Sequence, residues 1–404
     1  MKAGANTLEQ LCEPGRKITY GVVKPGHEVE DGVRFIRGGD VFQGRIAEDV
    51  LRTISPQLSE QYKRTILRGG ELLVSLVGNP GEVAVVPERL EGANIARQVG
   101  LVPLGLQANH NFVMYFLRSP LGRAQLFTRT QGAVQQVINL ADLKTIEVPD
   151  ISLDTQGRIA SILAAYDDLI ENNQRRIQLL DQAARLLFKE WFVHLRFPGH
   201  EHVKIKDGVP EGWERKKIAN ICETVGGGTP STKVSEYWEG DITWVVPSDI
   251  TKNDCLALLD SERKITEKGL RESSAKMVPA ETILMTSRAS VGFFALMDYE
   301  VCTNQGFINI IPHDGGIRMY LLFNLMSRVE EIRSNAKGTT FTEISKGRFR
   351  EMNVVVPTRT LVNEFAEFAN DVIRQVRNLK KSTLKLERAR DLLLPRLMNG
   401  EVAV

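Results

Sequence analysis

The sequence predicts an α+β protein in which two mixed, strand-rich modules alternate with two long helices of coiled-coil type. Two observations carry this prediction. The chain contains an internal tandem duplication that covers both halves. In addition, each half contains a long stretch whose apolar residues recur at alternating steps of three and four, which is the pattern of a coiled-coil seam.

The duplication is visible in three pairs of segments. "GELLVSLVGNPGEVAVVP" (70–87) has the build of "AETILMTSRASVGFFAL" (280–296): an acidic residue, an apolar strand, a glycine-containing turn and a second apolar strand. Likewise, "ARQVGLVPL" (96–104) matches "TNQGFINII" (303–311), and "QGAVQQVINLADLKTIEVP" (131–149) matches "KGTTFTEISKGRFREMNVVVP" (337–357). The separation stays near 206 to 210 residues, which indicates a tandem repeat.

Each predicted module consists of short apolar runs separated by glycine and proline turns. Strands are expected at 33–41, 71–78 and 82–87 in the first module, and at 242–250, 282–287 and 307–312 in the second. Helical patches lie near 110–129 and 316–336. The predicted organisation is therefore module 1 (1–149), first helical region (150–195), linker (196–213), module 2 (214–357) and second helical region (358–404).

The seam of the first long helix occupies ten positions. They are Ile159, Leu163, Tyr166, Ile170, Asn173, Ile177, Leu180, Ala184, Leu187 and Trp191. A shift of 206 positions gives the second seam in the same phase. It consists of Phe365, Ala369, Val372, Val376, Leu379, Thr383, Leu386, Arg390, Leu393 and Leu397, extended by Val362.

One such stripe alone is typical of a helix packed on a core, but two stripes in phase favour two rods that pack against each other. The polar seam residues Asn173, Thr383 and Arg390 would then fix the register. A rod from about 155 to 193 is roughly 58 Å long at 1.5 Å per residue. Because one turn of B-DNA measures about 34 Å, a pair of such rods is long enough to act as a spacer.

The composition indicates a globular protein of two to four domains. The chain has 404 residues, of which 42% are hydrophobic and 25% charged, and a net charge of only +2. We expect a cytoplasmic protein, since the sequence has neither a long apolar run nor the apolar core of a signal peptide. The cysteines Cys12, Cys222, Cys255 and Cys302 are isolated, which favours reduced thiols over zinc ligands or disulfides.

The chain lacks the usual sequence motifs of nucleotide-driven or metal-dependent catalysis. Neither a phosphate-binding G-x-x-x-x-G-K-[ST] loop nor a dinucleotide-binding G-x-G-x-x-G is present. His200 and His202 lie in the linker and favour solvated side chains over a metal site. One enzymatic alternative stays open: Asp249, Glu262 and Lys264 have the loose D…E-x-K spacing of metal-dependent nucleases.

Features suited to nucleic acid recur at matching positions of the two halves. Arginine can form a forked hydrogen bond to guanine and Asn or Gln to adenine, while Gly, Ser and Thr allow the backbone to approach phosphates. Each such residue alone is more typical of an ordinary surface position, and the recurrence is what indicates binding. The candidate DNA-binding residues are Arg34, Arg37, Arg97, Gln98, Gln131, Thr229, Ser231, Lys233, Ser248, Ser287, Arg288, Asn304, Gln305, Lys337, Thr339 and Thr340.

Over essentially its whole length the chain resembles the specificity subunits of type I restriction-modification systems. In the second half, "PEGWERKKI" (210–218), "GGGTPSTKVSEYWEGDITWVVPSDI" (226–250), "SRASVGFFAL" (287–296) and "NQGFINIIP" (304–312) look like the strands of a target recognition domain. "ITYGVVKPG" (18–26), "VRFIRGGDV" (33–41) and residues 70–87 look like another version of it. Residues 138–173 and 354–370 look like the junctions between strand and rod.

The resemblance implies a non-catalytic subunit that reads double-stranded DNA. Each target recognition domain would read one half of a two-part target, and two antiparallel rods would set the unspecified gap. Two modification subunits, which are methyltransferases, would dock along the rods, and restriction or translocase subunits would join them. S-adenosylmethionine, ATP and magnesium are expected in those partners, and no cofactor is expected in this chain.

The sequence departs from the family pattern at two places, and two rival functions remain open. The first module lacks an equivalent of "GW…GGGTPS", so the modules are expected to read different sequences. The second junction, "PTRTLVNEF", lacks the Gln-x-x-Ile that Gln156 and Ile159 form in the first. The rivals are a scaffold whose modules bind protein, and a nuclease or methyltransferase that depends on Asp249 and Glu262.

Overall fold

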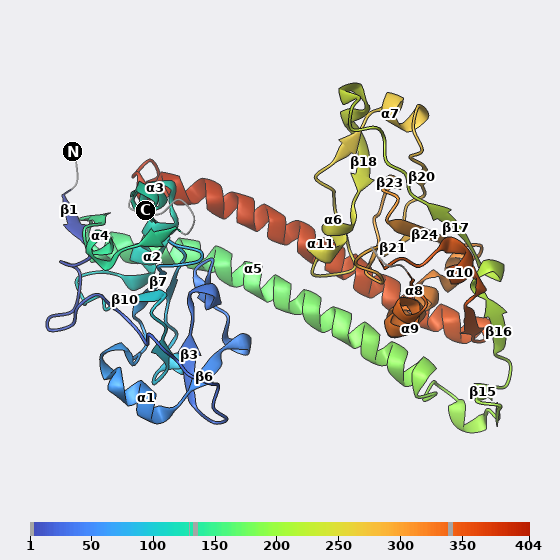
Figure 1. Cartoon of the computed structure of the whole chain (residues 1–404), viewed down its shortest axis with the longest axis horizontal. Helices are drawn as coiled ribbons and strands as arrows, with labels where there is room; N and C mark the ends of the chain where they lie inside the picture. The colour runs from blue at the N-terminus through green and yellow to red at the C-terminus, as the bar shows by residue number, and fades with distance from the viewer. Residues whose placement is uncertain (1–3, 129, 132–135, 338–341) are drawn as a thin grey trace. The chain divides into compact units, whose positions relative to one another are not determined.

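The computed structural model describes the chain except residues 1–3, 129, 132–135 and 338–341. It divides into two compact units, Met1–Leu169 with Leu386–Val404, and Ile170–Lys385. Each unit contains one of the predicted modules together with parts of the two long helices, α5 (Leu153–Phe188) and α11 (Arg359–Met398) (Figure 1). The predicted α+β class with duplicated modules is therefore confirmed.

The first module is built on an antiparallel four-stranded sheet with the order β2-β10-β7-β8. These strands are β2 (Thr19–Tyr20), β10 (Val99–Val102), β7 (Leu72–Ser75) and β8 (Val83–Val85). A second sheet contains β6 (Arg52–Ile54), β3 (Val33–Ile36) and β9 (Asn94–Ile95). The remaining elements include β1 (Ala5–Thr7), β4 (Val41–Phe42), β5 (Arg45–Ile46), α1 (Pro56–Gln61), α2 (His110–Arg118), α3 (Pro120–Thr128), β11 (Thr130–Gln131), β12 (Val137–Ile138), α4 (Leu140–Lys144) and β13 (Glu147–Pro149).

The second module repeats this plan with an antiparallel sheet of order β17-β24-β21-β22. These strands are β17 (Cys222–Gly226), β24 (Phe307–Pro312), β21 (Ile283–Thr286) and β22 (Phe294–Ala295). The second sheet contains β19 (Lys264–Ile265), β18 (Trp238–Val245), β23 (Val301–Thr303) and β20 (Met277–Val278). The remaining elements include β14 (Ile205–Lys206), β15 (Val209–Pro210), β16 (Glu214–Lys217), α6 (Pro247–Thr251), α7 (Glu267–Arg271), α8 (Arg318–Ser327), α9 (Val329–Ser334), α10 (Lys346–Glu351) and β25 (Asn353–Val356).

The two modules share the details that a duplication predicts. In both, the second sheet has one parallel strand pair, β3 with β9 and β18 with β23. In both, the strand at the start of the predicted module pairs with the strand that precedes a long helix, β1 with β13 and β16 with β25. Two predicted strands are wrong in their last parts. The strand expected at 33–41 ends at Ile36, and a short 3-10 helix, Gly38–Asp40, follows it. The strand expected at 242–250 ends at Val245, because Pro247 opens helix α6 and the carboxylate of Asp249 caps it.

The long helices bury the predicted seam. Every seam residue is buried or half-buried. In the first unit, Ile159 and Leu163 of α5 and Leu397 of α11 belong to one core with the module. In the second unit, Ile177 of α5 and Phe365 of α11 do the same, and Phe188, next to the seam, packs on Phe365 with ring centroids 5.6 Å apart. In each unit the N-terminal part of one helix thus lies with the C-terminal part of the other, so the two run antiparallel (Figure 1).

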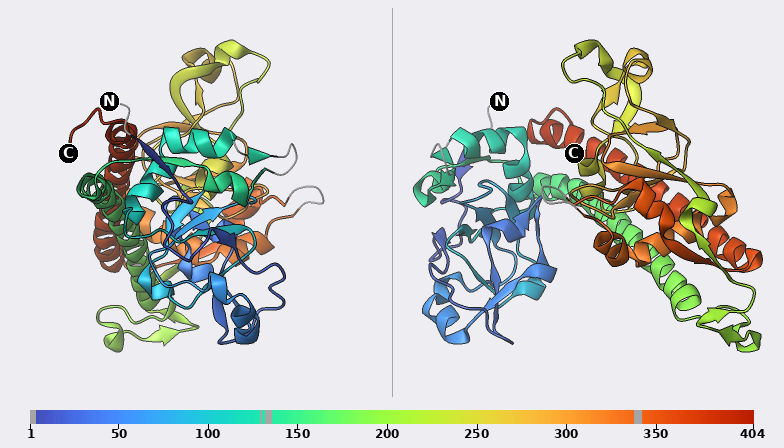
Figure 2. Two further views of the ribbon diagram at one scale, coloured as in Figure 1. Left: turned by 90° about the vertical axis from the view of Figure 1, so that its left-hand side faces the viewer. Right: turned by 45° about the vertical axis from the view of Figure 1, so that its right-hand side comes forward.

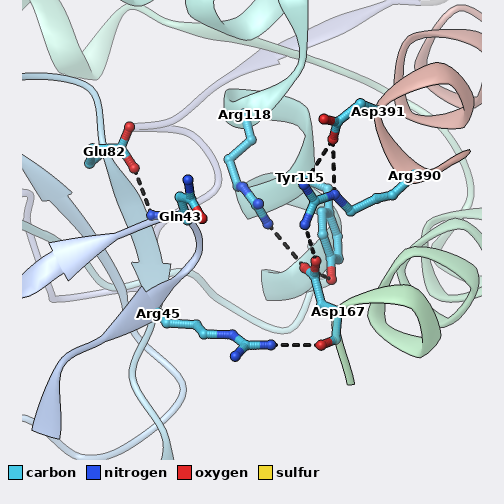
Figure 3. A network of polar contacts seen from close by, with 8 residues as sticks. All are labelled: Gln43, Arg45, Glu82, Tyr115, Arg118, Asp167, Arg390 and Asp391. Carbon is cyan, nitrogen blue, oxygen red and sulfur yellow. Dashed lines mark hydrogen bonds and ion pairs between the residues drawn. The ribbon is translucent and has the colours of Figure 1, made fainter. Parts of the chain in front are cut away.

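In the first unit, a polar network around Asp167 of α5 joins both helices to the module (Figure 3). Its carboxylate accepts hydrogen bonds from Arg390 of α11 (2.6 Å), from Arg118 (3.1 Å) and from the hydroxyl of Tyr115 (2.8 Å). The backbone oxygen of Asp167 accepts a further hydrogen bond from Arg45 at 2.7 Å. Because these donors come from β5, α2 and α11, one carboxylate ties together segments that are far apart in the sequence.

The network also shifts the acidity of its members. Burial acts to raise the pKa of Asp167, but the hydrogen bond from Arg390, together with Arg118 and Tyr115, outweighs it and leaves the pKa below its usual value. A carboxylate whose pKa is depressed by folding stabilises the folded state above its unfolded pKa. This contribution is lost as the pH falls through the folded pKa.

We expect Asp167→Ala to lower the free energy of unfolding of the first unit by about 3–5 kcal/mol. The substitution leaves Arg118 buried without its anion, and it leaves Arg390 with only the exposed carboxylate of Asp391. The side chains of Arg118 and Arg390 are only 10% and 15% exposed. Urea denaturation at neutral pH measures the change. A matched control is Asp154→Ala, which removes an exposed ion pair with Arg158 on the same helix and is expected to cost less than about 1 kcal/mol.

The depressed pKa of Asp167 predicts a dependence of stability on pH. The stability difference between wild type and Asp167→Asn should be largest near neutral pH and should shrink below about pH 4, near the ordinary pKa of an aspartate. A difference that stays constant between pH 7 and pH 3 would contradict the assignment of a depressed pKa to Asp167.

Candidate nucleic-acid interface

In the second module, a glycine loop lies directly against the segment that follows β23. A Cβ atom on Gly227 would stand 2.0 Å from the backbone oxygen of Asn304, and one on Gly228 would stand 2.1 Å from that of Ser274. Only glycine allows this approach. The loop (226–233) therefore holds Thr229 against Gln305, whose side-chain oxygen accepts a hydrogen bond from the Thr229 hydroxyl.

Two further turns complete this surface. The amide of Ser287 donates to the backbone oxygen of Gly306 (2.8 Å), and the amide of Ala289 donates to that of Thr342 (2.9 Å). The guanidinium of Arg288 lies 3.8 Å from the carboxylate of Glu343. Segments 226–233, 287–289, 304–306 and 342–344 thus meet on one face of the module, which we call surface 2.

Most of the candidate residues of this module lie on or beside surface 2. Ser231, Lys233, Ser248, Gln305 and Lys337 are exposed, while Thr229, Arg288 and Asn304 are half-buried. Ser287 is an exception: it is 2% exposed, so it cannot meet a ligand through its side chain, and we correct its assignment. Thr339 and Thr340 lie outside the described residues.

The first module brings the equivalent segments together. A Cβ atom on Gly38 would lie 3.0 Å from the backbone oxygen of Val77 and 3.3 Å from the Cβ atom of Gln98. The amide of Leu76 donates to the backbone oxygen of Gln98, and the amide of Ile138 donates to that of Leu76 (2.7 and 3.0 Å). Segments 37–39, 75–77, 97–98 and 137–138 form this face, which we call surface 1.

The candidate residues of surface 1 differ in how free their side chains are. Arg97 and Gln98 are exposed and form no side-chain hydrogen bond or ion pair with the described residues. Arg37, in contrast, binds both carboxylate oxygens of Asp40 at 2.8 and 3.0 Å, and this hydrogen bonding raises the pKa of Arg37. Arg34 donates to the backbone oxygen of Arg89 at 3.3 Å. For Gln131, the structure gives only its backbone pairing with Val137.

The sequence analysis missed one feature of the second module. Arg263 lies over the rings of Trp238 and Trp244, with its guanidinium carbon 4.2 and 5.1 Å from the two centroids. Its neighbours in the sequence, Glu262 and Lys264, are part of the loose nuclease spacing. The available signal is the pair of tryptophans in β18 followed by an arginine directly before β19. Stacked arginines are common at sites that recognise bases or phosphates.

The alternative nuclease site is not supported. The carboxylate of Asp249 accepts hydrogen bonds from the amide of Val246 (2.9 Å) and the hydroxyl of Ser261 (2.8 Å), which are structural contacts. Lys264 pairs with Asp260 at 3.5 Å. Among the described residues, which include His200 and His202, no group of three potential metal ligands is present.

The cysteines are unpaired thiols. Burial raises the pKa of Cys12 to about 11 and that of Cys222 to about 12. Thiols with such values are poor nucleophiles at neutral pH, and this agrees with a structural role.

In the part of the chain that the structure describes, no helix combines the length and the apolar character needed to cross a membrane.

The helix seams, which were predicted as a spacer and a docking strip for partners, are occupied within the chain. Leu180, Leu187, Trp191 and Leu379 pack on the core of the second unit, and Leu393 packs on that of the first. These side chains are half-buried within the chain, as expected for seams that pack on the cores of their own units. The large apolar side chains that α5 and α11 do expose include Leu169, Leu179, Leu186 and Leu392.

Comparison with known proteins gives a consistent match. The model of the type I restriction modification DNA specificity domain matches residues 8–182 and 210–388. The chain is 38% identical over 187 residues to the MjaIX specificity subunit of Methanocaldococcus jannaschii, covering 44% of this chain and 43% of that relative. It is 22% identical to the HindI specificity subunit of Haemophilus influenzae, covering 92% of this chain and 94% of that relative.

The fold is shared with a solved structure. The crystal structure of a type I restriction-modification system S subunit from M. genitalium superposes with a TM-score of 0.65 at 17% identity. The superposition covers 98% of this chain and 95% of that chain. The likeness at this identity concerns the fold, and it extends to both modules and both long helices.

We expect Gly227→Ala to displace the glycine loop, because the new Cβ atom would overlap the backbone oxygen of Asn304. DNA affinity, measured by titration of the purified complex with duplex DNA, should fall at least tenfold. Gly347→Ala is the matched control: Gly347 lies in helix α10 with open space around it, so alanine should be neutral or slightly stabilising. Unchanged affinity in Gly227→Ala would show that the loop takes no part in binding.

Proposed function

Because the chain belongs to the type I restriction modification DNA specificity family, we propose that it is the DNA-reading subunit of a type I restriction-modification complex. Each module reads one half of a two-part target in double-stranded DNA through surface 1 or surface 2. The chain itself is not catalytic. Methylation and cleavage are carried out by the partner subunits.

The observation that supports this proposal is the equivalence of the two surfaces. In both modules, a turn that follows the strand β7 or β21 meets the segment before β10 or β24, and exposed amide or cationic side chains gather there. The candidates themselves differ: Arg97 and Gln98 in one module correspond to Asn304 and Gln305 in the other. Equivalent scaffolds with different reading residues suit two different half-sites.

The long helices are proposed to act as the spacer. Each helix contributes residues to both units, so the DNA gap that lies between the half-sites would depend on helix length. Two modification subunits would dock on the helices, and the exposed leucines at 169, 179, 186 and 392 are the side chains that suit such a contact. S-adenosylmethionine, ATP and magnesium would be bound by those partners and by the restriction subunits.

The test is to express the chain with its modification subunit and to map methylated adenines in the host genome by single-molecule sequencing. The proposal predicts a two-part motif separated by a gap of fixed length. A stable complex that methylates no defined motif would favour a protein-binding scaffold instead.

The spacer role predicts the effect of helix length. Insertion of seven residues at equivalent points of α5 and α11 preserves the heptad seam. We therefore expect the motif to keep both half-sites and to change only the gap between them. Insertion of four residues at the same points is the control, because it breaks the seam and should abolish methylation. An unchanged gap in an active seven-residue variant would contradict the spacer role.

A further inference from the structure

Arg263 is held in place by two tryptophans in the second module. The rings of Trp238 and Trp244 meet edge to face, with centroids 5.0 Å apart and an interplanar angle of 83°. The guanidinium of Arg263 lies over both rings, closest to Trp238. Cation–π contact with two rings fixes the plane of the guanidinium without using its N–H donors.

The tryptophans connect Arg263 to surface 2. The indole N–H of Trp238 donates to the backbone oxygen of Ser231 at 3.1 Å, and that of Trp244 donates to the backbone oxygen of Gly228 at 2.9 Å. Trp244 is 2% exposed and forms part of the core. The platform under Arg263 is therefore rigid, and it is continuous with the glycine loop that carries Thr229 and Lys233.

The donors of Arg263 are free. Its side chain is exposed and forms no hydrogen bond or ion pair with the described residues. Arginine has five N–H donors in a fixed fork, which matches a pair of acceptors such as guanine O6 and N7 or two phosphate oxygens. Arg37, whose fork is already filled by Asp40, shows the contrast. Arg263 is thus preorganised and lacks only a ligand with two acceptors.

The backbone beside Arg263 contains a β-bulge and a residue with a positive φ. The pairing of β18 with β19 shifts register between Trp238 and Ile242, which is a β-bulge, and Glu239 inside it has a positive φ of 62°. A Cβ atom on Gly240 would stand 2.5 Å from the backbone oxygen of Ile265, so glycine is required there. Bulges and strained residues of this kind concentrate at functional sites, where they direct side chains.

The bulge lies on a projecting part of the second module, and such a position suits an element that enters a groove of DNA. Strand β18 and helix α7 project away from α11 in all views of the second module (Figures 1 and 2). A pocket opens at this place, and it is lined by Trp238, Glu239, Gly240, Glu262, Arg263 and Lys264.

The composition of the pocket distinguishes between the two ligands with paired acceptors. Glu239 and Glu262 are exposed carboxylates in the same pocket as Arg263, and they would repel a phosphate. A base edge carries no charge, and a carboxylate can accept a hydrogen bond from the amino group of cytosine. The neighbouring glutamates therefore favour a G·C base pair over the DNA backbone.

We propose that Arg263 reads a guanine in the major groove of the half-site bound by the second module, with the two tryptophans as its positioning platform. This inference rests on the proposed function. It adds a specificity-determining residue that lies outside the segments recurring in both halves, since the sequence of the first module contains no tryptophan.

The experiment compares methylation motifs of complexes that contain the wild-type chain, Arg263→Lys or Arg263→Ala. Lysine keeps the positive charge but loses the fork and the flat stacking. We expect both variants to lose selection at one guanine of one half-site by roughly 5- to 150-fold, the range for a bidentate contact. The other positions of the motif should be unchanged. Arg215→Lys, an exposed arginine on β16, is the control and should leave the motif intact.

The possible outcomes separate this inference from the proposed function. Relaxed selection at a single guanine would support the reading role. Uniformly weaker methylation with an unchanged motif and a smaller salt dependence, as for a lost phosphate contact, would overturn it. An unaltered motif and rate would also overturn it. A wild-type complex without any motif would refute the proposed function itself, and the inference about Arg263 with it.

Discussion

The structure depends on the burial of one apolar seam along each long helix. A helix of this length cannot cover such a seam by itself. Here one part of each seam is buried in the core of the first unit, and the other part is buried in the core of the second unit. Ile159 and Leu163 complete the core of the first unit, while Ile177 and Phe365 complete that of the second. The modules are therefore not appended to the helices but share their cores, and this fixes how each reading surface is oriented on the helix ends of its own unit.

Ion pairs between the long helices and the modules accompany this apolar packing. The helix provides the anion in the first unit and the cations in the second. In the first unit, the anion Asp167 lies on a helix and receives Arg118 from the module. In the second unit, the cations Arg377 and Lys381 lie on helix α11 and pair with Glu281 and Asp298 of the module (2.9 and 3.0 Å). Attachment of a module to the wrong helix end would bring like charges together. The reversal thus favours the correct pairing of two otherwise similar modules.

The sequence predicts the architecture well because its signals are local or periodic. The repeat offset, the heptad phase and the alternation of apolar runs with glycine turns each lie within a short window, and strands β7, β8, β21 and β24 follow from them. The polar details depend instead on partners that are distant in the sequence. The Asp167 network joins residues from 45 to 390, and no pattern predicts that set.

The same reason explains which candidate residues the sequence assigned poorly. Ser287 occupies a turn, where serines are usually exposed, but surrounding backbone buries it. Arg37 is neutralised by Asp40, three residues away, which a search for basic residues overlooks. Arg263 was missed because its importance comes from the rings of Trp238 and Trp244, which only the folding of β18 against β19 brings beneath it.

The two units are proposed to read DNA independently through equivalent surfaces. The most direct measurement is the methylation motif of two complexes, one with Arg97→Ala in the first module and one with Lys233→Ala in the second. We expect the two substitutions to weaken methylation of different half-sites, each leaving the other half-site and the gap unchanged. If both substitutions affected the same half-site, or if neither changed the motif or its rate of methylation, the assignment of one reading surface to each unit would be contradicted.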